Sequence, residues 1–122
     1  MRYLVVIAAI SGFVGVAMGA WVAHGLEGRL DARALARLDT AVRYQLWHTV
    51  ALIGIAALAA LRPAPSLTIA AIGFVVGVVL FSGSLYALAF TGLRGFAIIT
   101  PVGGLAFLVG WLCLAWYGVQ RP

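Results

Sequence analysis

The residues of this sequence that are best suited to chemistry are a histidine, an amide and several hydroxyls, spaced to share one face of a helix. Tyr44 and Gln45 lie four and three residues before His48, so a helix through this stretch would present all three on one side. Ser82 and Tyr86 are likewise four residues apart. With their neighbours they form a candidate polar cluster, which comprises His24, Arg43, Tyr44, Gln45, His48, Ser82, Ser84, Tyr86 and Thr100. Such a cluster can hold a proton, an ion or a ligand, or it can join helices by hydrogen bonds.

Catalytic and metal chemistry are not expected from this cluster. His24 and His48 lack the HxxxH or HExxH spacing of a helical metal site, and Cys113 is the only cysteine. Ser82 and His48 could form a nucleophile–base pair, but the apolar runs hold no carboxylate to orient the histidine, and no GxSxG motif is present. We therefore expect a protein that is not an enzyme, with no catalytic residue, no metal site and no cofactor.

The composition places these residues in a membrane. The chain has 122 residues, of which 65% are hydrophobic and 9% charged, whereas a soluble domain is about 45–50% apolar and about 25% charged. The net charge of +5 would suggest nucleic acid in a soluble protein, but the basic residues, all arginines, stand at the edges of apolar runs. That position favours contact with lipid headgroups. Membrane lipids are therefore the expected partners, and nucleic acid is not.

The arginines divide the chain into apolar runs that are long enough to cross a bilayer. A hydrocarbon core of about 30 Å needs about 20 helical residues, and only helices or closed barrels satisfy their backbone in lipid. The runs predict four spans, at about residues 3–23, 44–61, 67–91 and 96–119. The first run resembles a secretory signal, but its length and its single Arg2 favour a retained span. The expected fold is all-α, an integral membrane four-helix bundle forming one membrane domain over residues 1–122.

The segment between the first two spans, residues 29–43, has the pattern of an amphipathic helix. Asp31 can cap a helix that begins at Ala32. One side of the segment is apolar and the opposite side is basic: Leu30, Ala34, Leu38, Ala41 and Val42 against Arg29, Arg33, Arg37 and Arg43. The helix either lies in the headgroup plane or runs straight into the span at 44–61. Contact with the lipid surface and a solvated connector packed on the bundle are equally compatible with the pattern.

Small residues recur at spacings that let membrane helices approach closely. In lipid, helices associate through close backbone contact and interhelical hydrogen bonds. The expected packing residues are Ser11, Gly15 and Gly19 in the first span, Gly73 and Gly77 in the third, and Gly103 and Gly104 in the fourth. These patches predict a tight bundle, and one of them could pack on a second copy to form a homo-oligomer.

Four spans place both termini on one side of the membrane, here called the terminal side. The 24–43 segment and the turn at 92–95 lie on the other side, here called the loop side. At about 1.5 Å per residue, His48 is about 7–8 Å further along its span than Arg43, so most of the polar cluster falls in the loop-side leaflet. An ionisable residue within a span points to function by default. A neutral His48 bonded to the next helix would, however, only join the bundle, and both interpretations stay open.

Two functions fit this pattern. The first is a structural, accessory or lipid-interacting role without catalysis. The second is a subunit of a small transporter or channel with a polar intramembrane site around His48, which would need an oligomer because four spans are few for a pathway. Thr100 and Pro101 could form a gating hinge or only a fitted bend. A cluster sealed by its neighbours would favour the first function, and a wet pocket would favour the second.

Four stretches of the sequence carry a family resemblance. They read GAWVAHGL at 19–26, TAVRYQLWH at 40–48, FSGSLY at 81–86 and TPVGG at 100–104. In this order they resemble domain-of-unknown-function family 423, which comprises small four-span proteins of the bacterial inner membrane. The resemblance implies a multi-pass protein of the inner (plasma) membrane without an established activity, and it assigns no catalytic role to any residue.

The orientation in the membrane is indicated by two opposing features. Five arginines lie on the loop side and three on the terminal side, and the more basic side usually faces the cytoplasm. Proteins of the resembled family often have basic C-terminal tails, which indicate that their termini lie in the cytoplasm. This chain lacks such a tail. We expect cytoplasmic termini.

Overall fold

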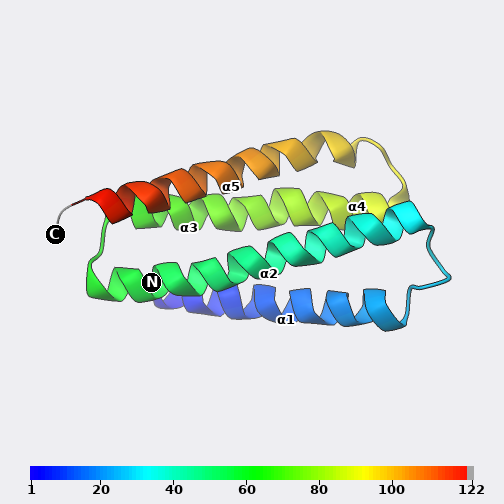
Figure 1. Cartoon of the computed structure of the whole chain (residues 1–122), viewed down its shortest axis with the longest axis horizontal. Helices are drawn as coiled ribbons and strands as arrows, with labels where there is room; N and C mark the ends of the chain where they lie inside the picture. The colour runs from blue at the N-terminus through cyan, green and yellow to red at the C-terminus, as the bar shows by residue number, and fades with distance from the viewer. Residues whose placement is uncertain (121–122) are drawn as a thin grey trace.

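The computed structural model describes residues 1–120 as long helices joined by short connections (Figure 1). The elements are α1 (Arg2–His24), α2 (Ala32–Leu61), α3 (Pro65–Gly77), η1 (Val78–Ser82), α4 (Gly83–Thr91) and α5 (Phe96–Val119). α3, the π-helical turn η1 and α4 follow one another without a break and form the third span, Pro65–Thr91. Within residues 1–120, four helices are long and apolar enough to cross a membrane, which confirms the predicted all-α membrane fold. Arg121, one of the three terminal-side arginines, lies outside the described residues.

The helices begin and end close to the positions that the sequence indicates. The third span begins at Pro65 instead of residue 67, because proline fits the first turn of a helix, where its missing N–H has no partner to lose. α4 ends at Thr91 and is capped by Gly92, whose φ of +70° is a left-handed conformation that glycine adopts without strain. The fourth span matches the predicted residues 96–119.

The amphipathic segment and the second span are one helix. α2 runs from Ala32 to Leu61 without interruption, so of the two predicted arrangements the segment runs straight into the span. Residues 29–31 precede this helix, which begins at Ala32 as predicted. Asp31 caps the helix as expected, because its carboxylate accepts a hydrogen bond from the Ala34 N–H at 2.7 Å.

The four spans lie side by side and alternate in direction (Figure 1). α1 packs on α2, α2 packs along the third span, and α5 packs on the third span. α1 and α5 form the outer helices. Only 11% of the most apolar stretch of α1 is buried inside the protein, and only 17% of that of α5. The connections at residues 25–31 and 92–95 lie together at the loop side, and the 62–64 turn lies with the two termini.

Glycines set the close approach of α5 to the third span. A Cβ at Gly77 would overlap the ring of Phe107, and a Cβ at Gly103 would overlap the backbone of Phe81. At Gly73 an added Cβ would lie 2.9 Å from the carbonyl oxygen of Ala106. Gly104, by contrast, meets Phe81 only at an ordinary 3.8 Å. Three of the four expected packing glycines of these two spans thus lie where a side chain has no room.

The small residues of α1 lie against α2. An added Cβ at Gly15 would lie 2.7 Å from a methyl group of Leu46, and one at Gly19 would lie 3.3 Å from Val42. Ser11 contacts the same helix through a hydrogen bond described below. This stripe is therefore used within the chain, which leaves it no room to pack on a second copy.

The apolar face of the first turns of α2 is buried in the protein. Ala34 and Leu38 form a small core with Leu26 from the loop and Ala89 from α4. The arginines of this segment lie on the other sides of the helix, where Arg33 is exposed and Arg37 is half-buried. The segment is therefore a connector packed on the bundle, and its apolar side is not available to lipid.

Candidate functional site

The polar side chains within the spans form links between particular helices. Each link is a set of connected hydrogen bonds, and the longest one joins three helices. The Tyr86 hydroxyl of α4 donates to Gln45 Oε1 of α2 at 2.5 Å, and Gln45 Nε2 donates to the Ser11 carbonyl of α1 at 2.9 Å. The Ser11 hydroxyl lies 2.7 Å from the hydroxyl of Thr49, which donates to the Gln45 carbonyl at 2.7 Å. Gln45 is only 4% exposed, so its amide joins α1, α2 and α4 in a region without water to compete.

His48 joins α2 to α5. Its Nδ1 lies 2.6 Å from the Tyr44 carbonyl oxygen, and its Nε2 lies 3.0 Å from the indole nitrogen of Trp111. A carbonyl only accepts and an indole N–H only donates, so these partners fix the neutral tautomer with the proton on Nδ1. The imidazole also stacks on the ring of Phe107, with centroids 3.6 Å apart, and meets the edge of Phe74. Both ring nitrogens are thus used within the protein.

The serines of the third span contact two different helices. Ser82 is fully buried, and its hydroxyl donates to the Ala41 carbonyl of α2 at 2.8 Å. The Ser84 hydroxyl lies 2.6 Å from the Thr100 hydroxyl of α5 and 2.9 Å from the Phe81 carbonyl. Ser82 therefore forms no nucleophile–base pair with His48, because each side chain is bonded to a different partner.

The remaining residues of the candidate cluster lie apart from these links. His24 is exposed at the end of α1, and Arg43 is exposed and paired with Asp39 at 2.7 Å. Tyr44 contributes its carbonyl to His48 and its ring to an aromatic group with Phe81 and Phe107. The structure thus divides the cluster into four links, centred on Gln45, His48, Ser82 and Ser84, with His24 and Arg43 outside them.

Three side chains of the links were not in the candidate cluster. Thr49 follows Gln45 by four residues, so its place on the same helix face could be read from the sequence. Trp111 carries an N–H that needs an acceptor when its ring lies against the protein, yet nothing in the sequence indicated that the acceptor would be His48. Ser11 had been assigned to packing, and its hydroxyl also serves as a polar contact.

The links leave no buried polar atom without a partner in the described part of the chain. Every buried side-chain nitrogen or oxygen of residues 1–120 has a hydrogen bond. A hollow of about 220 Å³ lies beside Ser11 and Gln45, but its other walls are apolar side chains of α1, α2, α3 and η1. No group of three histidine, cysteine, aspartate or glutamate side chains within residues 1–120 could hold a metal ion.

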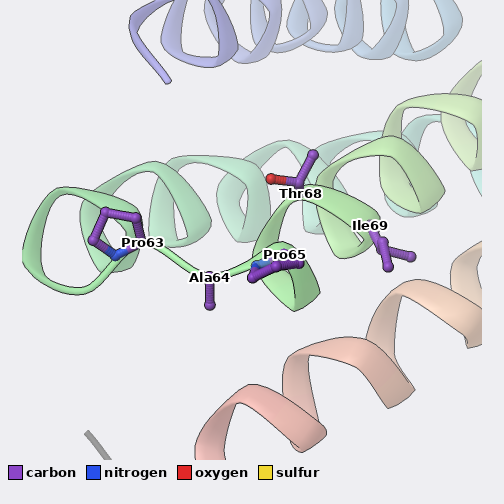
Figure 2. Close-up of a pocket in the computed structure, with 5 residues that line it drawn as sticks. All are labelled: Pro63, Ala64, Pro65, Thr68 and Ile69. Atoms are coloured by element: carbon purple, nitrogen blue, oxygen red, sulfur yellow. The ribbon is translucent and has the colours of Figure 1, made fainter.

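The terminal side has a polar contact and a hollow of its own. The Arg62 guanidinium donates to the Tyr117 carbonyl at 3.0 Å and lies 4.1 Å above the centre of the Tyr117 ring. The Tyr117 hydroxyl in turn donates to the Arg62 carbonyl at 3.1 Å. A hollow of about 510 Å³ at the α2–α3 turn is drawn in Figure 2 and is lined by Pro63, Ala64, Pro65, Thr68 and Ile69. No member of the candidate cluster lines it.

Comparison with known proteins identifies relatives along most of the chain. The UPF0382 membrane protein of Haemophilus influenzae is 46% identical over 115 residues, which are 94% of this chain and 91% of the relative. The UPF0382 inner membrane protein YgdD of Escherichia coli is 43% identical over 110 residues, 90% of this chain and 84% of the relative. The UPF0382 membrane protein YwdK of Bacillus subtilis is 38% identical over 115 residues, 93% of this chain and 94% of the relative.

A family model gives the same result. The model described as Protein of unknown function (DUF423) matches residues 18–104, a range that includes all four stretches on which the resemblance rested. No solved structure matches the chain. The relatives and the four long apolar helices make the chain a small multi-pass protein of the inner membrane. The resemblance is confirmed, and the chain belongs to the DUF423 family of membrane proteins of unknown function.

Proposed function

We propose that the protein is a structural or accessory component of the inner membrane, without enzymatic activity, and that its partners are membrane lipids. One observation carries this proposal: within residues 1–120, every buried polar side-chain atom of the spans has a hydrogen-bond partner inside the chain. Gln45, His48 and Ser82 each use their polar atoms within the chain. Because an unsatisfied polar group is costly in a medium of low dielectric, these pairs hold the bundle together.

The same pairing disfavours transport and catalysis. A polar route across the membrane needs side chains that exchange partners with water or an ion, whereas Gln45 and His48 are both only 4% exposed. A hydrolytic site needs a nucleophile within hydrogen-bond reach of a base that a third group orients. Here Ser82 donates to a backbone carbonyl and His48 accepts from Trp111.

A second copy of the chain is a further partner that we propose. Self-association would use the outer faces of α1 and α5, because these two helices are the least buried. Most of the glycines that the sequence offered for this purpose are occupied within the chain, at Gly15, Gly73, Gly77 and Gly103.

A flux measurement tests the proposed function. The purified protein is reconstituted into liposomes that contain a pH-sensitive or a potassium-sensitive dye, and an electrical gradient is applied. The proposal predicts the same leak as in empty liposomes, with an added ionophore as the positive control. A flux above that leak that disappears in the Gln45→Leu or the His48→Ala variant would assign the polar links to transport and contradict the proposal.

A further inference from the structure

The loop side of the protein carries arginine side chains without a protein counter-charge. Within residues 1–120 a single ion pair is present, between Arg43 and Asp39 at 2.7 Å. The other arginines at this end have no carboxylate within salt-bridge distance: Arg29, Arg33, Arg37 and Arg94. The loops that carry Arg29 and Arg94 lie at the same end of the bundle as the first turn of α2 (Figure 1). These four residues are here called the loop-side arginines.

Aromatic residues mark the level of the membrane surface on this side. Trp21 of α1 stacks on Phe90 of α4 with ring centroids 5.3 Å apart, and both rings are more than 40% exposed. Aromatic side chains of this kind gather at the boundary between hydrocarbon and headgroups. Tyr3, which is exposed at the other end of α1, lies 18 residues from Trp21, or about 27 Å at 1.5 Å per residue. This length matches a hydrocarbon core of about 30 Å.

The membrane surface marked by Trp21 and Phe90 can also be located along α2. Leu38 of α2 and Ala89 of α4 belong to one buried cluster, and Ala89 directly precedes Phe90. Arg37 therefore lies at the level of the aromatic pair, and Arg33 lies one turn, about 6 Å, further out. Arg94 follows Phe90 by four residues and is exposed. The loop-side arginines thus lie at or above the headgroup level.

Arg43 differs from them in depth and in pairing. It lies six residues further into α2 than Arg37, about 9 Å deeper by the helical rise. An arginine in the hydrocarbon needs a counter-charge or contact with the surface, and Arg43 reaches back toward the surface to Asp39. The protein therefore supplies a carboxylate to Arg43, whereas the loop-side arginines can bind anions from outside the protein.

The surroundings of the loop-side arginines favour the phosphate of a lipid as that anion. Of the three carboxylates on this side, Asp39 is bound to Arg43 and Asp31 caps α2, which leaves Glu27. The apolar face of the segment is buried against Leu26 and Ala89, so the segment cannot insert as an amphipathic surface helix. Polar contact of this segment with the lipid headgroups can then come from its guanidinium groups, whose planar donors match phosphate oxygens.

We infer that the loop-side arginines, Arg29, Arg33, Arg37 and Arg94, form a docking surface for the phosphate groups of anionic phospholipids. This inference rests on the lipid contact of the proposed function. It specifies the residues that make the contact, the negative charge of the lipid and the loop-side leaflet. Each arginine near a membrane surface strengthens binding of anionic lipid about fivefold at moderate salt. The preference weakens as the salt concentration rises, because the charges are exposed.

The test is a lipid titration of the full chain in an uncharged detergent. Phosphatidylglycerol or phosphatidylcholine is added, and the bound lipids are counted by native mass spectrometry. We expect tighter binding of phosphatidylglycerol, and a loss of on the order of one hundredfold in the combined Arg33→Gln, Arg37→Gln and Arg94→Gln variant. The control is Arg2→Gln at the terminal side, which removes one exposed arginine and should weaken binding of phosphatidylglycerol by no more than about fivefold. Because Arg33, Arg37 and Arg94 make no side-chain hydrogen bond or ion pair within residues 1–120, the variants should melt at the wild-type temperature.

Three results would overturn the inference. Equal affinity of the wild-type chain for the two lipids would mean that the surface is not a site for anionic lipid. An acidic protein would then be the alternative ligand of these arginines. An equal loss in the Arg2→Gln control would show that total charge matters and position does not. Displacement of phosphatidylglycerol by millimolar inorganic phosphate at constant ionic strength would assign the surface to a soluble phosphate. None of these results depends on the flux measurement, so the inference can fail while the proposed function stands.

Discussion

The imidazole of His48 in α2 accepts a hydrogen bond from the indole of Trp111 in α5, with the two nitrogens 3.0 Å apart. These helices make their main backbone contacts with the third span and not with each other. The His48–Trp111 bond therefore reaches across the side of the bundle and ties the second span to the fourth, while Phe107 stacks on the imidazole from the same helix.

Removal of the imidazole should destabilise the bundle. In the His48→Ala variant the Trp111 N–H loses its acceptor and the ring of Phe107 loses its stacking partner, which should cost about 1–3 kcal/mol of unfolding free energy. The measurement is a thermal melting curve in detergent. His24→Ala is the matched control, because that histidine is exposed, and it should melt like the wild type. An unchanged midpoint in the His48 variant would show that the bond does not stabilise the bundle.

The bond between Tyr86 and Gln45 should appear as a coupling energy. Tyr86→Phe and Gln45→Leu each remove one partner, so the double variant should be more stable than the sum of the single losses predicts, by about 1 kcal/mol. Melting curves of the four proteins give this value. A cycle of Tyr86→Phe with Ser84→Ala is the control and should be additive, because Ser84 is bonded to Thr100. Additivity in the first cycle as well would contradict the link.

Glycine substitutions should separate packed from free positions. A Cβ at Gly77 would overlap the ring of Phe107, whereas a Cβ at Gly54 would meet nothing within 4 Å. Gly77→Ala should therefore cost about 1–3 kcal/mol by overpacking. Gly54→Ala should be neutral or stabilising by up to about 1 kcal/mol, because alanine favours a helix over glycine. Similar melting temperatures for the two variants would contradict the observed packing of α5 on the third span.

The contact between Arg62 and Tyr117 should hold the last turns of α5. In the Arg62→Gln variant the guanidinium can no longer lie over the ring, and the Tyr117 carbonyl loses a donor. Local opening of the helix end should then become easier. Hydrogen–deuterium exchange should show faster exchange of the amides at 114–120, with unchanged exchange in residues 96–106. Exchange that rises equally along α5 would indicate a general loss of stability instead.

The helices could be predicted from the sequence because the spans depend on local properties. Arginines and prolines separate runs of apolar residues, and each run has only one structure that satisfies its backbone in lipid. The same holds for the face shared by Gln45 and His48, which follows from helical spacing alone. The cap at Asp31 is local as well.

The partners of the polar residues could not be predicted, because they depend on how each helix is rotated about its axis. α5 is apolar on all sides, so its sequence does not mark the face that turns toward α2 and brings Trp111 to His48. The division of the expected cluster into four links has the same cause. Ser82 and Tyr86 are four residues apart and lie on one helix face. Ser82 nevertheless bonds the Ala41 carbonyl, whereas Tyr86 bonds the Gln45 amide.

Cysteine labelling in membrane vesicles measures most directly whether the buried polar side chains of the spans bind partners within the chain and not water. In a Cys113→Ala background, Ser82→Cys and Ser84→Cys place thiols within two of the links, and Leu93→Cys places one in the exposed loop. A water-soluble maleimide applied to both faces of the membrane should label the loop thiol and leave the other two unlabelled. Labelling of the Ser82 or Ser84 position at the rate of the loop position would reveal a water-filled path and contradict the account.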